Sequence, residues 1–264
     1  MPEGPEYALC AENFNTDVSG TIGKIVVDDN KKMKDFSEKV QKIVGYKFHE
    51  AVSHGKSLFL IFKNGKKYSI IHSKFGLHGD WQITADEIIY NKAVRLVIEM
   101  SNGMNCVFTD PTNFGNTYLI NYNDMLQIII ETFDPLKEDI TIDTLRKHLS
   151  HGRIKTKNVS VSLLEQEPIS GIGNYLRSEI LYSAKIHPLT TCEEILRNGA
   201  LQRALLKAIN GIPVKIYTAM KSNKRDYFKV YSRDRTPKGE LVETISINKR
   251  IVYFVGAVPA PETP

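Results

Sequence analysis

The residues with the most distinctive chemistry stand at the start of the chain. Pro2 follows Met1, and removal of Met1 would expose the secondary amine of Pro2. Such an amine can attack C1′ of a sugar and form an iminium ion, which acidifies the C2′ proton and permits strand cleavage by elimination. Glu3 and Glu6 are its neighbours in sequence, and a carboxyl group whose pKa is raised by burial can protonate the ring oxygen or a departing base. The same string also fits an acidic, proline-containing helix start.

Three other positions could hold phosphate groups. The string SGIGNY at residues 170–175 places Gly173 and Asn174 at the start of a predicted helix, where backbone N–H groups and the helix dipole favour an anion. Lys56 opens a β-rich run and could bind phosphate or move a proton, and Arg250 at a predicted hairpin could bind phosphate through its fork of donors. Each also has an ordinary interpretation, as a helix–helix turn, a surface lysine or a solvated turn residue.

The sequence indicates neither a metal site nor a cofactor site. The seven histidines show no H-E-x-x-H or H-x-x-x-H spacing, and no nucleotide-binding loop occurs. Cys10, Cys106 and Cys192 are far apart and form no C-x-x-C pair, which excludes the usual zinc and disulfide patterns. We therefore expect three free, buried thiols, no metal and no cofactor.

Charge is concentrated toward the end of the chain. The 264 residues carry a net charge of +5, and residues 221–250 contain nine lysines and arginines against four acidic residues. This distribution fits either a polyanion partner or a solvated basic face. No stretch is long and apolar enough to span a bilayer, and residues 1–6 lack the features of a signal peptide, so we expect an intracellular protein.

The first half of the chain predicts strands and one helix. The β-rich runs lie at 56–62, 66–72, 94–100 and 104–110. Asn64-Gly65 and Asn102-Gly103 separate the members of each pair and permit the positive φ of a tight turn. A short helix should begin at Pro5, with an apolar side made by Ala8, Leu9 and Phe14.

The second half changes to helical periodicity and then returns to strands. Helical spacing occurs at 123–133, 142–149, 159–166, 175–185 and 192–220, and strands are expected at 227–231, 242–247 and 251–255. Asn174 is the expected N-cap of the fourth helix, Pro188 its stop, and 248–250 the final turn. The fold class is thus α+β: a β-sandwich with an N-terminal helix (1–122), a helical domain (123–224), a small antiparallel hairpin (225–256) and a flexible tail (257–264).

The order of these motifs resembles the Fpg/Nei (formamidopyrimidine-DNA glycosylase/endonuclease VIII) family. The terminal string PEGPE, Lys56 on an early strand, the string GIGN at 171–174 and Arg250 in a final hairpin occur in the family's order. The run 163–188 is similar to the family's helix-two-turn-helix signature, and the resemblance extends to about Val255.

The resemblance implies roles for these residues. Pro2 would be the Schiff-base nucleophile and Glu3 the general acid, while Lys56 would bind phosphate near the lesion and assist elimination. Asn174, beside Gly173, and Arg250 would hold the phosphates that flank a flipped nucleotide, and Arg250 would favour a second elimination. The remaining implied residues are Glu6 and Glu179 as supporting carboxylates, and Leu77 and Phe114 as wedges that fill the vacated space in the duplex.

The chain departs from many relatives at three places. Thr112 and Asn113 stand where many relatives have two arginines, one of which pairs with the orphaned base, so opposite-base discrimination stays open. Asn91 stands where many relatives have a DNA-contacting histidine. No cysteine follows Cys192, so the tail resembles the zincless finger of the Nei-like-1 branch. Its hairpin must then be held by the apolar residues Val242, Ile245, Ile247, Val252, Phe254 and Val255.

The resemblance implies a bifunctional DNA glycosylase/AP lyase of base excision repair that uses β,δ-elimination. Residues 220–228 look too short for the lid that covers 8-oxoguanine in some relatives, which favours oxidised pyrimidines, hydantoins and ring-opened purines. The expected partner is damaged DNA, as duplex, bubble or single strand, bound by a monomer. The alternatives are a non-catalytic nucleic-acid-binding protein, which predicts salt-sensitive binding without bond cleavage, and a relative that has lost activity.

Overall fold

The computed structural model describes residues 1–150, 157–224 and 226–256, so the predicted tail 257–264 lies outside the described residues. The chain forms two compact units. The first contains residues 1–2 and 6–130, and the second contains residues 3–5 and 131–264. Among the described helices, none has the length and apolar character needed to cross a membrane.

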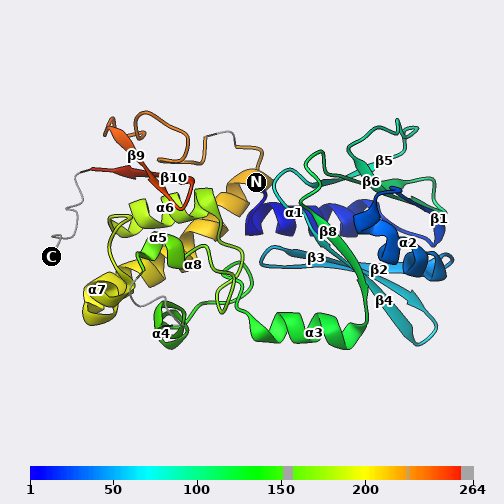
Figure 1. Ribbon diagram of the computed structural model, residues 1–264, viewed down its shortest axis with the longest axis horizontal. Helices are drawn as coiled ribbons and strands as arrows, with labels where there is room; N and C mark the ends of the chain where they lie inside the picture. The colour runs from blue at the N-terminus through cyan, green and yellow to red at the C-terminus, as the bar shows by residue number, and fades with distance from the viewer. Residues whose placement is uncertain (151–156, 225, 257–264) are drawn as a thin grey trace. The chain divides into compact units, whose positions relative to one another are not determined.

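The first unit contains two antiparallel four-stranded sheets, which confirms the predicted β-sandwich (Figure 1). The first sheet has the order β1 (Ile22–Val27), β6 (Val94–Met100), β7 (Asn105–Thr109) and β5 (Asp80–Thr84). The second has the order β2 (Lys47–His54), β3 (Ser57–Asn64), β4 (Lys67–Lys74) and β8 (Asn116–Ile120). The β3–β4 and β6–β7 hairpins form at the predicted Asn-Gly turns, where Gly65 and Gly103 have φ of 59° and 85°.

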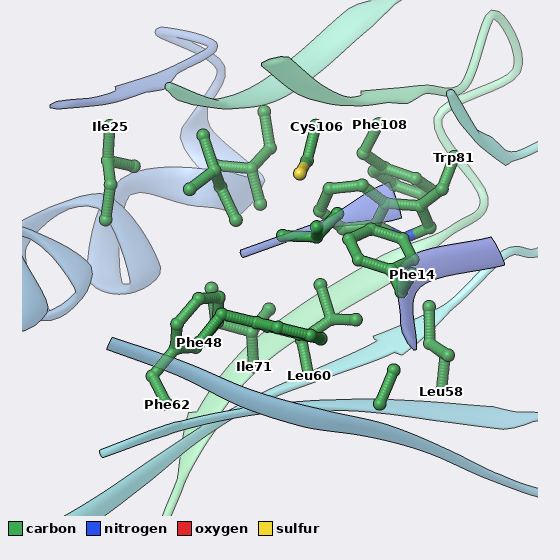
Figure 2. Packing of buried hydrophobic residues seen from close by; sticks show 14 of the residues in the cluster. Phe14, Ile25, Phe48, Leu58, Leu60, Phe62, Ile71, Trp81, Cys106 and Phe108 are labelled. Carbon is green, nitrogen blue, oxygen red and sulfur yellow. The ribbon is translucent and has the colours of Figure 1, made fainter. Parts of the chain in front are cut away.

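Helix α1 (Gly4–Asp17) contributes to the core between these sheets. Phe14 packs edge-on against Trp81 with ring centroids 5.4 Å apart, and Figure 2 shows both among side chains from the two sheets. Ala8 is buried as predicted, but Leu9 is only half-buried. The prediction for Leu9 was wrong because the buried side of the helix is defined by Tyr7 and Phe14, which are seven residues, or two turns, apart.

Short helices precede β2 and follow β8, and they pack against the sandwich in two different apolar clusters. Helix α2 (Lys34–Val40) lies between the 3₁₀ turns η1 (Lys31–Met33) and η2 (Gln41–Ile43). Helix α3 (Tyr122–Glu131) buries Met125 in a second apolar cluster with residues of β3 and β4. Because that cluster includes Phe59 and Ile70, α3 covers the face of the second sheet that points away from the main core.

The second unit is mainly helical. Its helices are α4 (Ile142–Ser150), α5 (Val159–Ser162), α6 (Asn174–Ala184), α7 (Cys192–Arg197) and α8 (Gly199–Lys221). Helix α5 is a single turn, shorter than the predicted 159–166. The predicted helix 192–220 is broken at Asn198, which has extended backbone and whose side chain accepts hydrogen bonds from the N–H groups of Ala200 and Leu201. This side-chain cap starts α8 and therefore ends α7.

A two-stranded hairpin, β9 (Val242–Ile247) and β10 (Arg250–Val255), completes the second unit. Asn248 and Lys249 have φ of 50° and 62° and form its two-residue turn. Val252 is fully buried against the helical core, and the ring of Phe254 packs edge-on against His187 at 5.0 Å. Apolar side chains of the hairpin thus pack against the helical core.

Candidate active site

The carboxylate of Glu3 is bound to the first turn of α6. Glu3 is 1% exposed, and its two oxygens accept hydrogen bonds from the N–H groups of Gly173 (2.8 Å), Tyr175 (2.8 Å) and Leu176 (3.1 Å). These N–H groups have no partner within the helix, and the positive end of the helix dipole lies at the same place. Three donors and this dipole favour the ionised carboxylate.

Gly173 makes this approach possible. It is the N-cap of α6, and a Cβ atom built on it would collide with the carboxyl group of Glu3. Gly4, which follows Glu3 in the chain, donates its N–H to the carbonyl of Gly171 at 2.9 Å, and Gly171 has φ of 93°. In the predicted phosphate-binding string, Gly171 and Gly173 therefore contact Glu3 and Gly4 of the same chain.

Asn174 lies beside the start of the final hairpin. It is the first residue of α6 and not the predicted N-cap, because the Glu3 carboxylate accepts the bonds that an N-cap side chain would accept. Its amide donates to the carbonyl of Ile251 at 3.0 Å and accepts from the guanidinium of Arg177. The structure thus brings Asn174 next to the exposed Arg250, which is the first residue of β10.

Arg177 is a site residue that the sequence analysis missed. Its side chain is fully buried and also donates to the carbonyl of Ser160 at 3.2 Å. Burial, and to a smaller extent the positive charge of Arg250, lower the pKa of Arg177 to about 10, while the charge of Glu3 opposes this shift. The sequence carried one signal for Arg177, namely an arginine among the apolar residues of a predicted helix. Because burying a cation is costly without hydrogen-bond partners, an arginine at such a position indicates that partners surround it.

Glu179 is an anchor for the segment before the hairpin. It is 2% exposed and accepts hydrogen bonds from the N–H groups of Lys229, Val230 and Tyr231, each at 2.9 Å. These bonds explain why the predicted strand 227–231 is wrong: its N–H groups point at a carboxylate rather than at a neighbouring strand. The same part of the unit lines a cavity of about 410 Å³ together with α6 and α8.

Pro2, Glu6 and Lys56 belong to the first unit. Pro2 is half-buried next to the exposed Met1, and Glu6 is half-buried in the first turn of α1. Lys56 is not on a strand as predicted but in the two-residue turn between β2 and β3, after Gly55 with φ of 54°.

The two predicted wedges stand on loops that touch. Leu77 and Phe114 are 37% and 61% exposed. Gly76, with φ of 69°, lies so close to the other loop that a Cβ atom would be 2.5 Å from the backbone nitrogen of Gly115. A second link that sequence reasoning missed supports the Leu77 loop: the N–H of Phe75 donates to the hydroxyl of Tyr7 at 2.6 Å, across 68 residues of sequence.

The residues at the first two departures from the family pattern, Thr112, Asn113 and Asn91, make local contacts. Thr112 donates its hydroxyl and its N–H to Asp110, at 2.7 and 3.0 Å. Asn113 has φ of 56°, and Asn91 accepts from the N–H of Ala93 at 2.8 Å, so each shapes its own loop. Burial alone would raise the pKa of Asp110, but hydrogen bonds from Gly115 and the Thr112 turn outweigh it and lower that pKa.

Metal ligands do not gather in the described part of the chain. No group of three or more His, Cys, Asp or Glu side chains could hold an ion there. The three cysteines are free and buried, as predicted.

Comparison with known proteins identifies relatives over nearly the whole chain. The family model "Formamidopyrimidine-DNA glycosylase N-terminal domain" matches residues 1–117, and "Formamidopyrimidine-DNA glycosylase H2TH domain" matches residues 132–217. A formamidopyrimidine-DNA glycosylase of Chloroflexus aurantiacus is 26% identical, with 96% of each chain covered. Endonuclease 8 of Escherichia coli is 24% identical, with 96% of this chain and 98% of the relative covered.

The fold also matches solved structures. The complex between the Lactococcus lactis Fpg and DNA containing an abasic site superposes with a TM-score of 0.82, 21% identity and coverage of 97% of this chain and 98% of that one. At this identity the match concerns the fold: the sandwich, the helical region and the terminal strand pair.

Proposed function

The chain belongs to the Fpg/Nei family, and from this premise we propose that it is a base excision repair enzyme, a DNA glycosylase with AP lyase activity. One observation carries the proposal: the carboxylate of Glu3, which directly follows Pro2 in the chain, is fixed on the N-terminus of α6. A buried anion one residue from the N-terminal imino acid has a clear use in amine catalysis.

The first chemical step is attack by Pro2. After Met1 is removed, the protonated amine of Pro2 must lose a proton before its lone pair can bond to C1′, and the ionised Glu3 is the adjacent acceptor. As the N–C1′ bond forms, the bond from C1′ to the damaged base breaks, and the base leaves with its electron pair and takes up the remaining N–H proton of Pro2. Glu3 then returns a proton to the sugar ring oxygen, the ring opens, and Pro2 is left as an iminium ion on C1′.

Two eliminations follow from that iminium ion. It acidifies the C2′ proton, whose loss expels the 3′ phosphate, and loss of the C4′ proton from the resulting conjugated iminium ion then expels the 5′ phosphate. Lys56 binds phosphate near the lesion and assists this proton transfer. Asn174 and Arg250 hold flanking phosphates, which is supported by the contact of Asn174 with the carbonyl next to Arg250. Arg250 is exposed and presents a planar fork suited to phosphate.

The reaction requires an extrahelical nucleotide. Leu77 and Phe114 fill the space that it leaves, and their exposure on two touching loops supports this role. The hairpin without cysteines resembles that of the zincless branch, and the segment 220–228 is short for a lid over 8-oxoguanine. The enzyme's substrates are then oxidised pyrimidines, hydantoins and ring-opened purines, which need no lid of the kind that covers 8-oxoguanine.

A panel of oligonucleotides, each with one lesion, tests this function. We expect release of thymine glycol, dihydrouracil and hydantoins, weaker release of 8-oxoguanine, and incision products with phosphate at both ends. A preparation that retains Met1 is the matched control, because its Pro2 nitrogen is an amide. Binding that weakens with salt but releases no base and cleaves no abasic site would instead support a non-catalytic nucleic-acid-binding protein.

A further inference from the structure

Lys32 holds the loop that carries Phe114. Its ammonium group donates to the carbonyls of Asn113 (2.8 Å) and Gly115 (2.5 Å), the two residues on either side of Phe114. More than 80 residues of sequence separate Lys32 from this loop. The exposed aromatic ring therefore stands between two carbonyl groups that one cation fixes.

The backbone of Lys32 is itself fixed. Asn30 caps the turn by accepting from the N–H of Lys32 at 2.8 Å, and its amide donates to Asp28 at 2.9 Å and to the side chain of Asn113 at 3.4 Å. Asp28 pairs with Arg95 at 2.5 Å. These hydrogen bonds and the ion pair fix the turn from which the side chain of Lys32 extends to the loop.

Asp110 holds the same loop from the inside. It accepts from the N–H of Gly115 at 2.6 Å and from Thr112, while its carbonyl accepts from the Nε of Arg95 at 3.0 Å. With Asp110 on the buried side and Lys32 on the exposed side, the main chain on both sides of Phe114 is restrained. A restrained wedge loses less conformational entropy when it enters a base stack.

We propose that Lys32 is the positioning residue for the Phe114 wedge, and that it thereby sets activity on duplex rather than single-stranded DNA. This inference rests on the proposed function. A wedge matters only where an opposing strand leaves a gap to fill, so loss of Lys32 should affect duplex substrates selectively.

The test compares kcat/KM for one lesion in duplex and in single-stranded form. Lys32→Met should lower the duplex value roughly tenfold and leave the single-strand value nearly unchanged. Lys32→Arg should retain most duplex activity, because a guanidinium can donate to both carbonyls. Lys39→Met is the matched control, since Lys39 is a surface lysine of the adjacent helix, paired with Asp35, and its loss removes the same charge.

A double-mutant cycle separates positioning from a general structural effect. In a Phe114→Ala background, Lys32→Met should cause no further loss on duplex DNA. Equal losses on duplex and single strand, a loss that persists without Phe114, or no loss at all would overturn the role of Lys32. Absence of base release by the unmodified protein on either substrate would instead overturn the proposed function, and this inference with it.

Discussion

The carboxylate of Glu3 occupies the space where a side chain on Gly173 would begin. This relationship joins two motifs that are 170 residues apart in sequence, the N-terminal PEGPE string and the GIGN string before α6. A glycine is needed here because the Glu3 carboxylate must reach the helix N-terminus, where three N–H groups and the helix dipole favour its charged form and hold it in place.

Gly173→Ala should therefore impair catalysis more than folding. The new methyl group displaces the Glu3 carboxylate, which can swing aside at a stability cost of about 1–3 kcal/mol, while base release should fall roughly 10²-fold or more. Base-release kinetics and thermal unfolding measured together check this. Gly211→Ala is the control, because a Cβ atom there meets nothing within 4 Å and alanine favours the helix. Equal activity of the two variants would contradict the account of Glu3.

Glu179→Gln should loosen the segment that precedes the hairpin. The carboxamide cannot accept all three N–H groups, because its own NH₂ group faces donors, and the free energy of unfolding should fall by about 1–3 kcal/mol. Hydrogen exchange of the Lys229, Val230 and Tyr231 amides should accelerate selectively. Glu165→Gln, at an exposed position, should leave those amides unchanged. Unaltered exchange at Lys229–Tyr231 in the Glu179 variant would show that another group holds the segment.

His72 should make the first unit sensitive to acid. Burial lowers its pKa to about 4, with a smaller contribution from the charge of Lys74, while an unfolded histidine titrates near 6.5. Between these values the unfolded chain binds a proton that the folded chain does not, so stability is complete above about pH 6.5 and falls as the pH drops toward 4, by up to about 3 kcal/mol. Urea unfolding at a series of pH values measures this.

His72→Phe is the matching variant, because phenylalanine preserves the stacking on Phe59, whose ring lies 4.7 Å away. Ser57→Ala should accompany it, since the hydroxyl of Ser57 is hydrogen-bonded to His72 at 2.9 Å. The double variant should lose less stability than the unmodified protein over pH 6.5 to 4. Parallel stability curves for the two proteins would mean that other groups cause the acid sensitivity.

Pro2→Gly should retain weak lyase activity. The glycine variant still begins with an amine, but it lacks the pyrrolidine ring, so its geometry and basicity differ and the rate of adduct formation should fall. Single-turnover cleavage of an abasic site, compared with thermal unfolding, distinguishes this from misfolding. Unimpaired cleavage by Pro2→Gly would mean that the ring is not needed.

Local sequence signals predicted most of the helices and strands correctly, and some of the errors arose from contacts with residues distant in sequence. The Asn64-Gly65 turn and the apolar period of α6 are properties of short segments, and both formed as predicted. The strand prediction for 227–231 was wrong because N–H groups of this segment donate to Glu179, about 50 residues earlier in the chain. The prediction of one continuous helix over 192–220 was wrong for a different reason. An asparagine such as Asn198 can either continue a helix or cap a new one, and hydrophobic periodicity does not distinguish the two.

In the candidate site, too, some residues could be identified from the sequence and others only from the folded structure. The order of motifs was sufficient to identify Glu3 and Asn174 as candidates. No spacing rule connects Lys32 with Phe114 or Tyr7 with Phe75, because those contacts arise only when the sandwich has folded. Residues that position the reacting groups are for this reason harder to find in one sequence than the reacting groups themselves.

Amine catalysis by Pro2 is tested by borohydride reduction of the protein on DNA with a single abasic site, followed by mass spectrometry of the trapped peptide. We expect a covalent adduct on a chain that lacks Met1, with the sugar remnant on the nitrogen of Pro2. An adduct carried by a lysine, or no adduct on a chain whose Met1 has been removed, would contradict this role of Pro2.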